Sequence, residues 1–77
     1  MNKDRRKRLA AIAETIEEQM SELEYVRDEE QEAFDNLPES LQYSDRGSEM
    51  EDGISEIDDI YNDLEDIRDR IQELCER

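Results

Sequence analysis

The sequence predicts an all-α fold, an antiparallel helical hairpin with a coiled-coil-like heptad seam, which we expect to dimerise into a four-helix bundle. Two long segments repeat apolar residues at the three- and four-residue spacing of a helix that buries one stripe. Between them stands the only proline, Pro38. A short connection of this kind makes consecutive helices antiparallel. We expect one domain, residues 1–77, with helices over about 3–35 and 45–76 and a bend over 36–44.

The first helical segment carries a heptad that begins with Leu9 at position a. Its a and d positions are mostly apolar, and the polar exceptions can fix the register of paired helices at some loss of stability. These positions are Leu9, Ile12, Ile16, Gln19, Leu23, Val26, Glu30, Ala33 and Leu37, with Ala13, Met20 and Phe34 widening the stripe at position e.

The bend consists of residues suited to ending one helix and starting another. Asn36 is one of the few non-glycine residues that tolerates the left-handed conformation common at helix ends, which makes it the candidate for that conformation here. Pro38 cannot continue a preceding helix but fits the first turn of a new one. Ser44 is suited to cap the second long helix, with Asp45 at the positive end of its dipole.

The second helical segment repeats isoleucine and leucine in the same spacing. Gly53 interrupts its stripe at a d position, where it either lets the first helix approach closely or marks a local irregularity. Two helices alone bury only one stripe each, so we favour a dimer over an isolated hairpin, which remains the alternative. The residues expected to form this core and oligomer seam are Leu9, Ile12, Ile16, Leu23, Val26, Phe34, Leu37, Ile57, Ile60, Leu64, Ile67, Ile71 and Leu74.

Charge is abundant and unevenly distributed. Charged residues make up 45% of the chain and the formal net charge is −15. Residues 1–8 carry five basic side chains against Asp4, a net of +4, which leaves −19 on residues 9–77. An antiparallel hairpin would bring the basic run from Arg5 to Arg8 beside Asp69, Glu73 and Glu76, where ion pairs are expected. A body this acidic repels nucleic acid, so direct nucleic-acid binding is not favoured.

No residue set indicates catalysis, a metal or a cofactor, and we expect none of these. The chain has no histidine to complete a metal-binding or acid–base pair with its carboxylates. Its one cysteine, Cys75, has acidic neighbours that would disfavour a thiolate, so a passive packing role is expected. No apolar run suits a membrane span or a signal peptide. We therefore expect a cytoplasmic protein that acts by binding another protein.

The outward carboxylates indicate where a partner could bind. Acids on adjacent helical turns lie about 5–6 Å apart, near the spacing of phosphates along a nucleic-acid strand. A rod with such charge could occupy a cationic nucleic-acid groove on another protein, although a solvated acidic face also simply favours solubility. The candidate partner surface comprises Glu17, Glu18, Tyr25, Asp58, Asp59, Asp63 and Asp66.

The bend also carries a recognisable motif. An acidic run leads into Phe34-Asp35-Asn36-Leu37-Pro38-Glu39-Ser40-Leu41-Gln42, followed by Ser44-Asp45-Arg46. This motif resembles that of small acidic helical proteins encoded by phages and prophages, whose second helix is richer in alanine and leucine than the isoleucine-rich one here. The resemblance implies only a helical hairpin and a phage context, in which the expected cytoplasmic location is that of the host cell, and it marks no catalytic residue.

Two functions follow as hypotheses. In the first, the chain is a non-enzymatic acidic module that binds a host protein with a basic surface, as a nucleic-acid mimic directed at a defence or nucleic-acid enzyme. In the second, it is a structural or assembly module whose role is homo-oligomerisation through the heptad seam.

Overall fold

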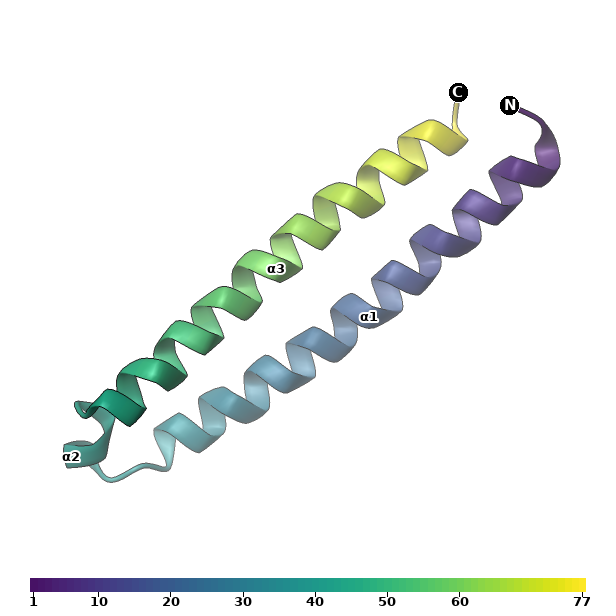
Figure 1. Ribbon diagram of the computed structural model, residues 1–77. Coiled ribbons are helices and arrows are strands. Elements are labelled where there is room, and N and C mark those ends of the chain that lie inside the picture. The colour runs from purple at the N-terminus through teal and green to yellow at the C-terminus, as the bar shows by residue number, and fades with distance from the viewer.

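The computed structural model describes residues 1–77 as two long helices joined by a helical turn. Helix α1 spans Lys3–Asp35, α2 spans Glu39–Gln42 and α3 spans Asp45–Cys75. The long helices lie side by side in opposite directions, with both termini at one end of the molecule and the bend at the other (Figure 1). The all-α hairpin predicted from the sequence is confirmed. It forms a thin rod of 59 × 14 × 11 Å.

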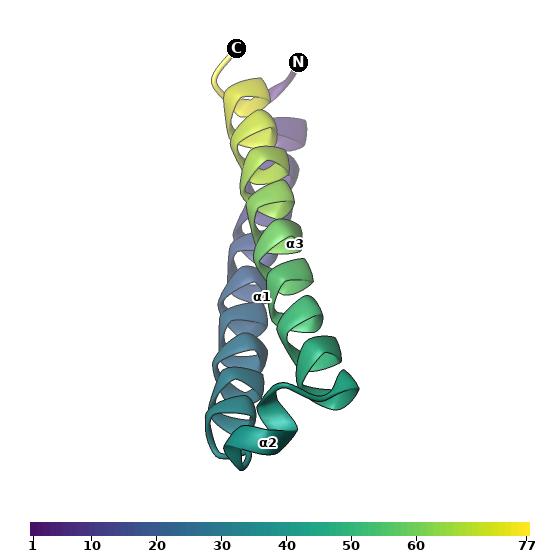
Figure 2. The same cartoon turned by 90° about the vertical axis from the view of Figure 1, so that its left-hand side faces the viewer.

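The two long helices meet along one continuous seam, and they cross at a shallow angle in a second view (Figure 2). Only Ala13, Met20 and Ile54 are fully buried apolar residues. The remaining seam residues are partly covered, because a two-helix rod leaves one side of each open to solvent. On α1 the seam comprises Leu9, Ala13, Ile16, Met20, Leu23, Arg27, Glu30 and Phe34, followed by Leu37 in the bend; on α3 it comprises Gly47, Met50, Ile54, Ile57, Tyr61, Leu64, Arg68, Ile71 and Cys75.

This seam uses a different pair of heptad positions from the expected one. Positions a and e face the other helix, whereas the residues at position d lie outside the contact. Ile12 and Val26 on α1 are each 50% exposed. Ile60 and Ile67 on α3 are 40% and 42% exposed. The hairpin therefore covers one apolar stripe of each helix, at positions a and e, and leaves a second stripe, at position d, exposed.

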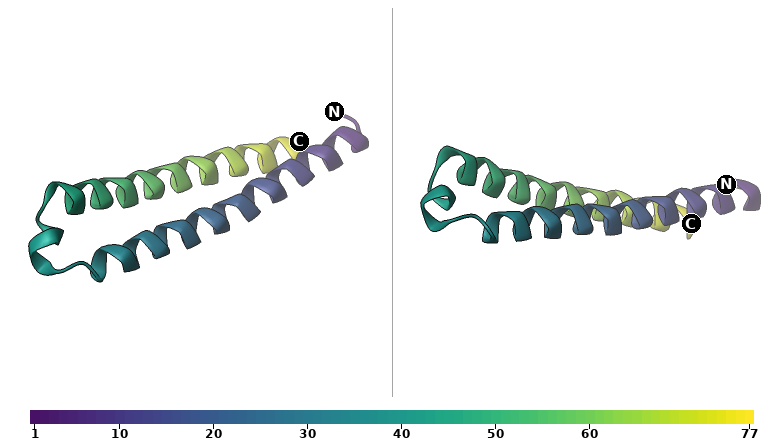
Figure 3. Two further views of the ribbon diagram at one scale, coloured as in Figure 1. Left: turned by 60° about the horizontal axis from the view of Figure 1, so that its bottom comes forward. Right: turned by 90° about the horizontal axis from the view of Figure 1, so that it is seen from below.

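The bend corrects the expectation for Asn36. This residue ends α1 in the right-handed helical region, with φ −84° and ψ −6°, and no residue of the chain has positive φ. The end of α1 is instead stabilised by the backbone amides of Asn36 and Leu37, which donate to the carbonyl oxygens of Glu32 and Phe34, and by α2, the single helical turn that closes the rod end between the two long helices (Figure 3). The Gln42 side-chain amide donates hydrogen bonds to the carbonyl oxygens of Phe34 and Leu37, each at 3.2 Å.

Ser44 begins α3 as expected. Its backbone is extended, and its hydroxyl accepts a hydrogen bond from the Gly47 amide at 3.4 Å. Gly47 itself lies so close to α2 that a Cβ there would overlap the Gln42 carbonyl oxygen. Gly53 has nothing within 4 Å of the corresponding position. The close approach considered for Gly53 is therefore wrong for that residue, and it occurs at Gly47.

The basic run is helical and lies beside the C-terminal end of α3. Arg6 donates a hydrogen bond to the Arg77 carbonyl oxygen, and the Cys75 thiol lies 3.5 Å from the Arg6 carbonyl oxygen. None of the basic side chains from Arg5 to Arg8 forms an ion pair, so the expected pairing with the acids of α3 is wrong. The basic side chains project from α1 and remain exposed.

Candidate functional site

The uncovered d positions form an apolar face on one side of the rod. We call Ile12, Val26, Ile60, Ile67 and Leu74 the apolar face. Each of these residues directly precedes a seam residue, and one helical step turns the chain by about 100°. Because α1 and α3 run in opposite directions, the same step turns both stripes toward the same side of the hairpin. Ile12 of α1 and Leu74 of α3 indeed line one groove together.

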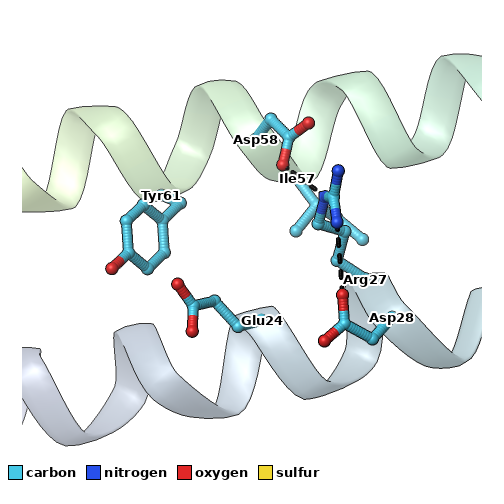
Figure 4. A pocket seen from close by; sticks show the side chains of 6 residues that line it. All are labelled: Glu24, Arg27, Asp28, Ile57, Asp58 and Tyr61. Atoms are coloured by element: carbon cyan, nitrogen blue, oxygen red, sulfur yellow. Dashed lines mark hydrogen bonds and ion pairs between the residues drawn. The ribbon is translucent and has the colours of Figure 1, made fainter.

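The opposite side of the rod is polar and carries interactions between the helices. Arg27 Nε of α1 lies 2.6 Å from Asp58 Oδ1 of α3. Arg68 of α3 lies 3.6 Å from the Glu17 carboxylate of α1. Between these two ion pairs, Tyr61 of α3 and Glu24 of α1 point toward each other (Figure 4). In each of the three pairs the two residue numbers add up to the same value. This is what two antiparallel helices give when they keep one register along their length.

This polar side contains a shallow depression of about 420 Å³ lined by Glu24, Arg27, Asp28, Ile57, Asp58 and Tyr61. Its arginine is already engaged by two carboxylates. Arg27 also pairs with Asp28 at 3.2 Å, and its interaction with Asp58 is the main reason that the pKa of its guanidinium is raised. The ion pair of Arg27 with Asp58 therefore links the two helices at this depression.

The Tyr61 hydroxyl is affected by the same cluster. The Glu24 carboxylate raises the pKa of Tyr61, because it interacts favourably with the neutral phenol, toward which it points, and would repel the phenolate. Partial burial in the seam acts in the same direction. Tyr61 thus contributes to the seam as a neutral group, whereas Tyr25 and Tyr43 are 64% and 83% exposed.

The candidate partner residues do not gather into one surface. Glu17 and Asp58 form the ion pairs of the polar side, with Arg68 and Arg27 respectively. Glu18 and Tyr25 lie on the outer side of α1, away from α3, and both are exposed. On the outer side of α3, the carboxylates at one-turn spacing are Asp59, Asp63 and Asp66, all exposed and without an ion-pair partner.

Cys75 lies at the open end of the seam, half-buried between α3 and the start of α1. No three acidic or cysteine side chains are grouped so that they could hold a metal ion. Neither long helix offers an apolar stretch that would cross a bilayer.

Sequence reasoning missed Gln42, Gly47, Arg27 and Arg68 as structural residues. The signal available for the two arginines was their position e in the heptad, one turn from apolar seam residues.

Comparison of the chain with protein-family models, with curated proteins and with solved structures finds no match.

Proposed function

We propose that this protein is a non-enzymatic assembly module in which two copies pair through the apolar face into a four-helix bundle. The observation that carries the proposal is the uncovered stripe of Ile12, Val26, Ile60 and Ile67, which are 40–50% exposed. These residues continue the heptad spacing of both helices, on the side opposite the ion pairs. A second apolar stripe in register with the first is typical of helices that contact two neighbours.

The hairpin exposes more area than a compact chain of the same mass, and the excess is large enough for an interface with a second copy. A compact monomer of 9.2 kDa exposes about 4,900 Å². The hairpin exposes 5999 Å², which is about 1,100 Å² more than the compact value. Specific interfaces of ordinary size bury about 800 Å² per partner. The radius of gyration, 17.5 Å, likewise exceeds the roughly 11.5 Å of a compact chain of this length. Pairing of two rods would bury the excess.

Sedimentation equilibrium tests the pairing. The wild-type chain should sediment at twice its mass of 9.2 kDa. Ile67→Asp should weaken association by roughly 100-fold or more, because it places an unpaired carboxylate in the interface. Asn62→Asp adds the same charge at an exposed position outside both stripes, so it should leave association unchanged. A wild-type chain that sediments as a monomer at high micromolar concentration would overturn the proposal.

A second candidate function is capture of a cationic host protein by the outer acids. It is favoured by Asp59, Asp63 and Asp66, which stand on one side of α3 with no cation to neutralise them. Pairing through the apolar face would leave these carboxylates exposed, so the two functions are compatible. The resemblance of the bend to phage proteins supports a host protein as the partner. The chain would bind it in the host cytoplasm by mimicking nucleic acid.

Affinity capture from a host lysate at low and at moderate salt tests this second function. A nucleic-acid-handling protein should be retained at low salt and released as salt rises. Replacing Asp59, Asp63 and Asp66 with lysine should abolish capture but not pairing. Ile67→Asp should abolish pairing while keeping the outer acids, so the two variants separate the functions. Salt-independent capture, or capture by the lysine variant, would contradict mimicry.

A further inference from the structure

Charge is strongly partitioned along the rod. The half nearer the termini comprises residues 1–18 and 67–77, which carry eight basic and seven acidic side chains, a net of +1. The half nearer the bend comprises residues 19–66, which carry two basic and eighteen acidic side chains, a net of −16. The antiparallel fold creates this partition, because it brings the basic start of α1 beside the arginine-rich end of α3.

The partition continues along the borders of the apolar face. At the open end, Arg5 and Arg8 of α1 line the groove that contains Ile12 and Leu74. Arg70 and Arg77 of α3 line the adjoining groove with Ile67 and Leu74, together with one acid, Glu73, which lies 3.7 Å from Arg77. Toward the bend, four exposed acids each stand one step before a seam residue that borders the apolar face. They are Glu22 and Glu29 on α1 and Glu49 and Glu56 on α3.

We infer that the second copy docks on the apolar face head to tail, with the two bends at opposite ends of the bundle. This inference rests on the proposed pairing and adds its orientation. Head-to-tail docking brings the arginines that border the open end of one copy beside the acids that border the bend end of the other. The apolar stripes run the length of both rods, so they meet in either orientation, and charge decides between the two.

The opposite orientation has a specific electrostatic disadvantage. Docking bend to bend would bring two halves of net charge −16 together in one half of the bundle, with the arginines gathered at the other end. Like charges facing each other across an interface disfavour a wrong arrangement by several kcal/mol. Head-to-tail docking instead gives each acidic half a neighbour of net charge +1. The ion pairs Arg27–Asp58 and Arg68–Glu17 lie on the far side of each rod and are undisturbed.

Charge exchange provides one test of the orientation. Arg70→Glu with Arg77→Glu should weaken self-association at least tenfold, because both ends of the head-to-tail bundle then oppose acids with acids. The complementary variant, Glu49→Arg with Glu56→Arg, should also self-associate poorly. Bend-to-bend docking opposes like charges at both ends with or without these substitutions, so it predicts no such loss. Self-association of both variants at the wild-type strength would therefore overturn head-to-tail docking.

Pulsed EPR distances between spin labels give the decisive test. On a Cys75→Ala background, Ser40→Cys labels the exposed bend and Glu18→Cys labels the exposed middle of α1. Head-to-tail docking separates the bend labels of a dimer by most of the 59 Å long axis and gives a short distance between the mid-rod labels. Short distances at both sites would overturn the orientation and retain the pairing. Absence of any dipolar interaction at the mid-rod site would overturn the pairing as well.

Discussion

Gly47 and Gly53 show how two glycines in one helix have opposite roles. A side chain at Gly47 would overlap the Gln42 carbonyl oxygen, whereas Gly53 faces open space. Gly47→Ala should destabilise the hairpin by about 1–3 kcal/mol through overpacking against α2. Gly53→Ala should stabilise it by about 1 kcal/mol, since alanine is the better helix former and meets no obstacle. Urea unfolding followed by circular dichroism measures both, and equal shifts in the two variants would contradict this account of the bend.

Gln42 has an equally local role. Its amide donates to the Phe34 carbonyl oxygen in the last turn of α1 and to the Leu37 carbonyl oxygen in the bend, which ties α2 to the end of α1. Gln42→Ala should lower the free energy of unfolding by about 1–2 kcal/mol, since it removes two hydrogen bonds at a partly buried site. Gln72→Ala, at an exposed position within α3, is the matched control and should have little effect. Similar destabilisation by the two variants would show that Gln42 does not cap α1.

Protonation of Tyr61 makes the stability of the hairpin depend on pH. Since Glu24 raises the pKa of Tyr61, the folded state favours the protonated phenol. This contribution to stability is fully present below the ordinary tyrosine pKa of about 10 and is lost as pH rises through the raised value. With Tyr25 and Tyr43 replaced by phenylalanine, ultraviolet absorbance reports Tyr61 alone. Glu24→Gln should lower its titration midpoint, Glu22→Gln should not, and an unchanged midpoint in Glu24→Gln would contradict the assignment.

At the scale of the helices, ion pairs hold the register but contribute little stability. The side chains of Arg27 and Asp58 are 36% and 48% exposed, so solvent screens their attraction. A double-mutant cycle with Arg27→Met and Asp58→Asn should give a coupling of about 0.2–1 kcal/mol that shrinks in high salt. Arg27→Met alone should be close to neutral, because methionine extends the apolar seam. A coupling well above this range would mean that the pair is a principal source of stability.

The heptad pattern was sufficient to predict the hairpin but not which stripe faces inward. Apolar residues occupy positions a, d and e of both helices, so a/d and a/e contacts were equally compatible with the spacing. The choice depends on pairs between the helices, such as Arg68 with Glu17, which form only when the e sides of the helices face each other. The ion pairs between the helices join residues 31 and 51 positions apart and leave no local pattern in the sequence.

The bend was predictable in position but not in detail. Pro38 and Ser44 carry local conformational preferences, and the structure uses the Ser44 cap that its sequence context predicts. Asn36 adopts the ordinary helical conformation because the Gln42 amide reaches the end of α1 from α2, which removes the need for a left-handed residue. The roles of Gln42 and Gly47 depend on the distance between two chain segments in space. No residue-by-residue preference could have indicated them.

At the scale of the whole molecule, the net charge of −15 opposes any association of two copies while the apolar face favours it. The Debye length falls from about 30 Å at 0.01 M salt to about 8 Å at 0.15 M, so added salt screens the repulsion over most of the rod and leaves apolar burial intact. We expect the dimer dissociation constant to fall at least severalfold over this range, measured by sedimentation equilibrium. Capture of a cationic partner should weaken over the same range, because there the long-range force is attractive. Pairing that weakens steadily as salt rises would mean that ion pairs between the copies, rather than the apolar face, hold the bundle together.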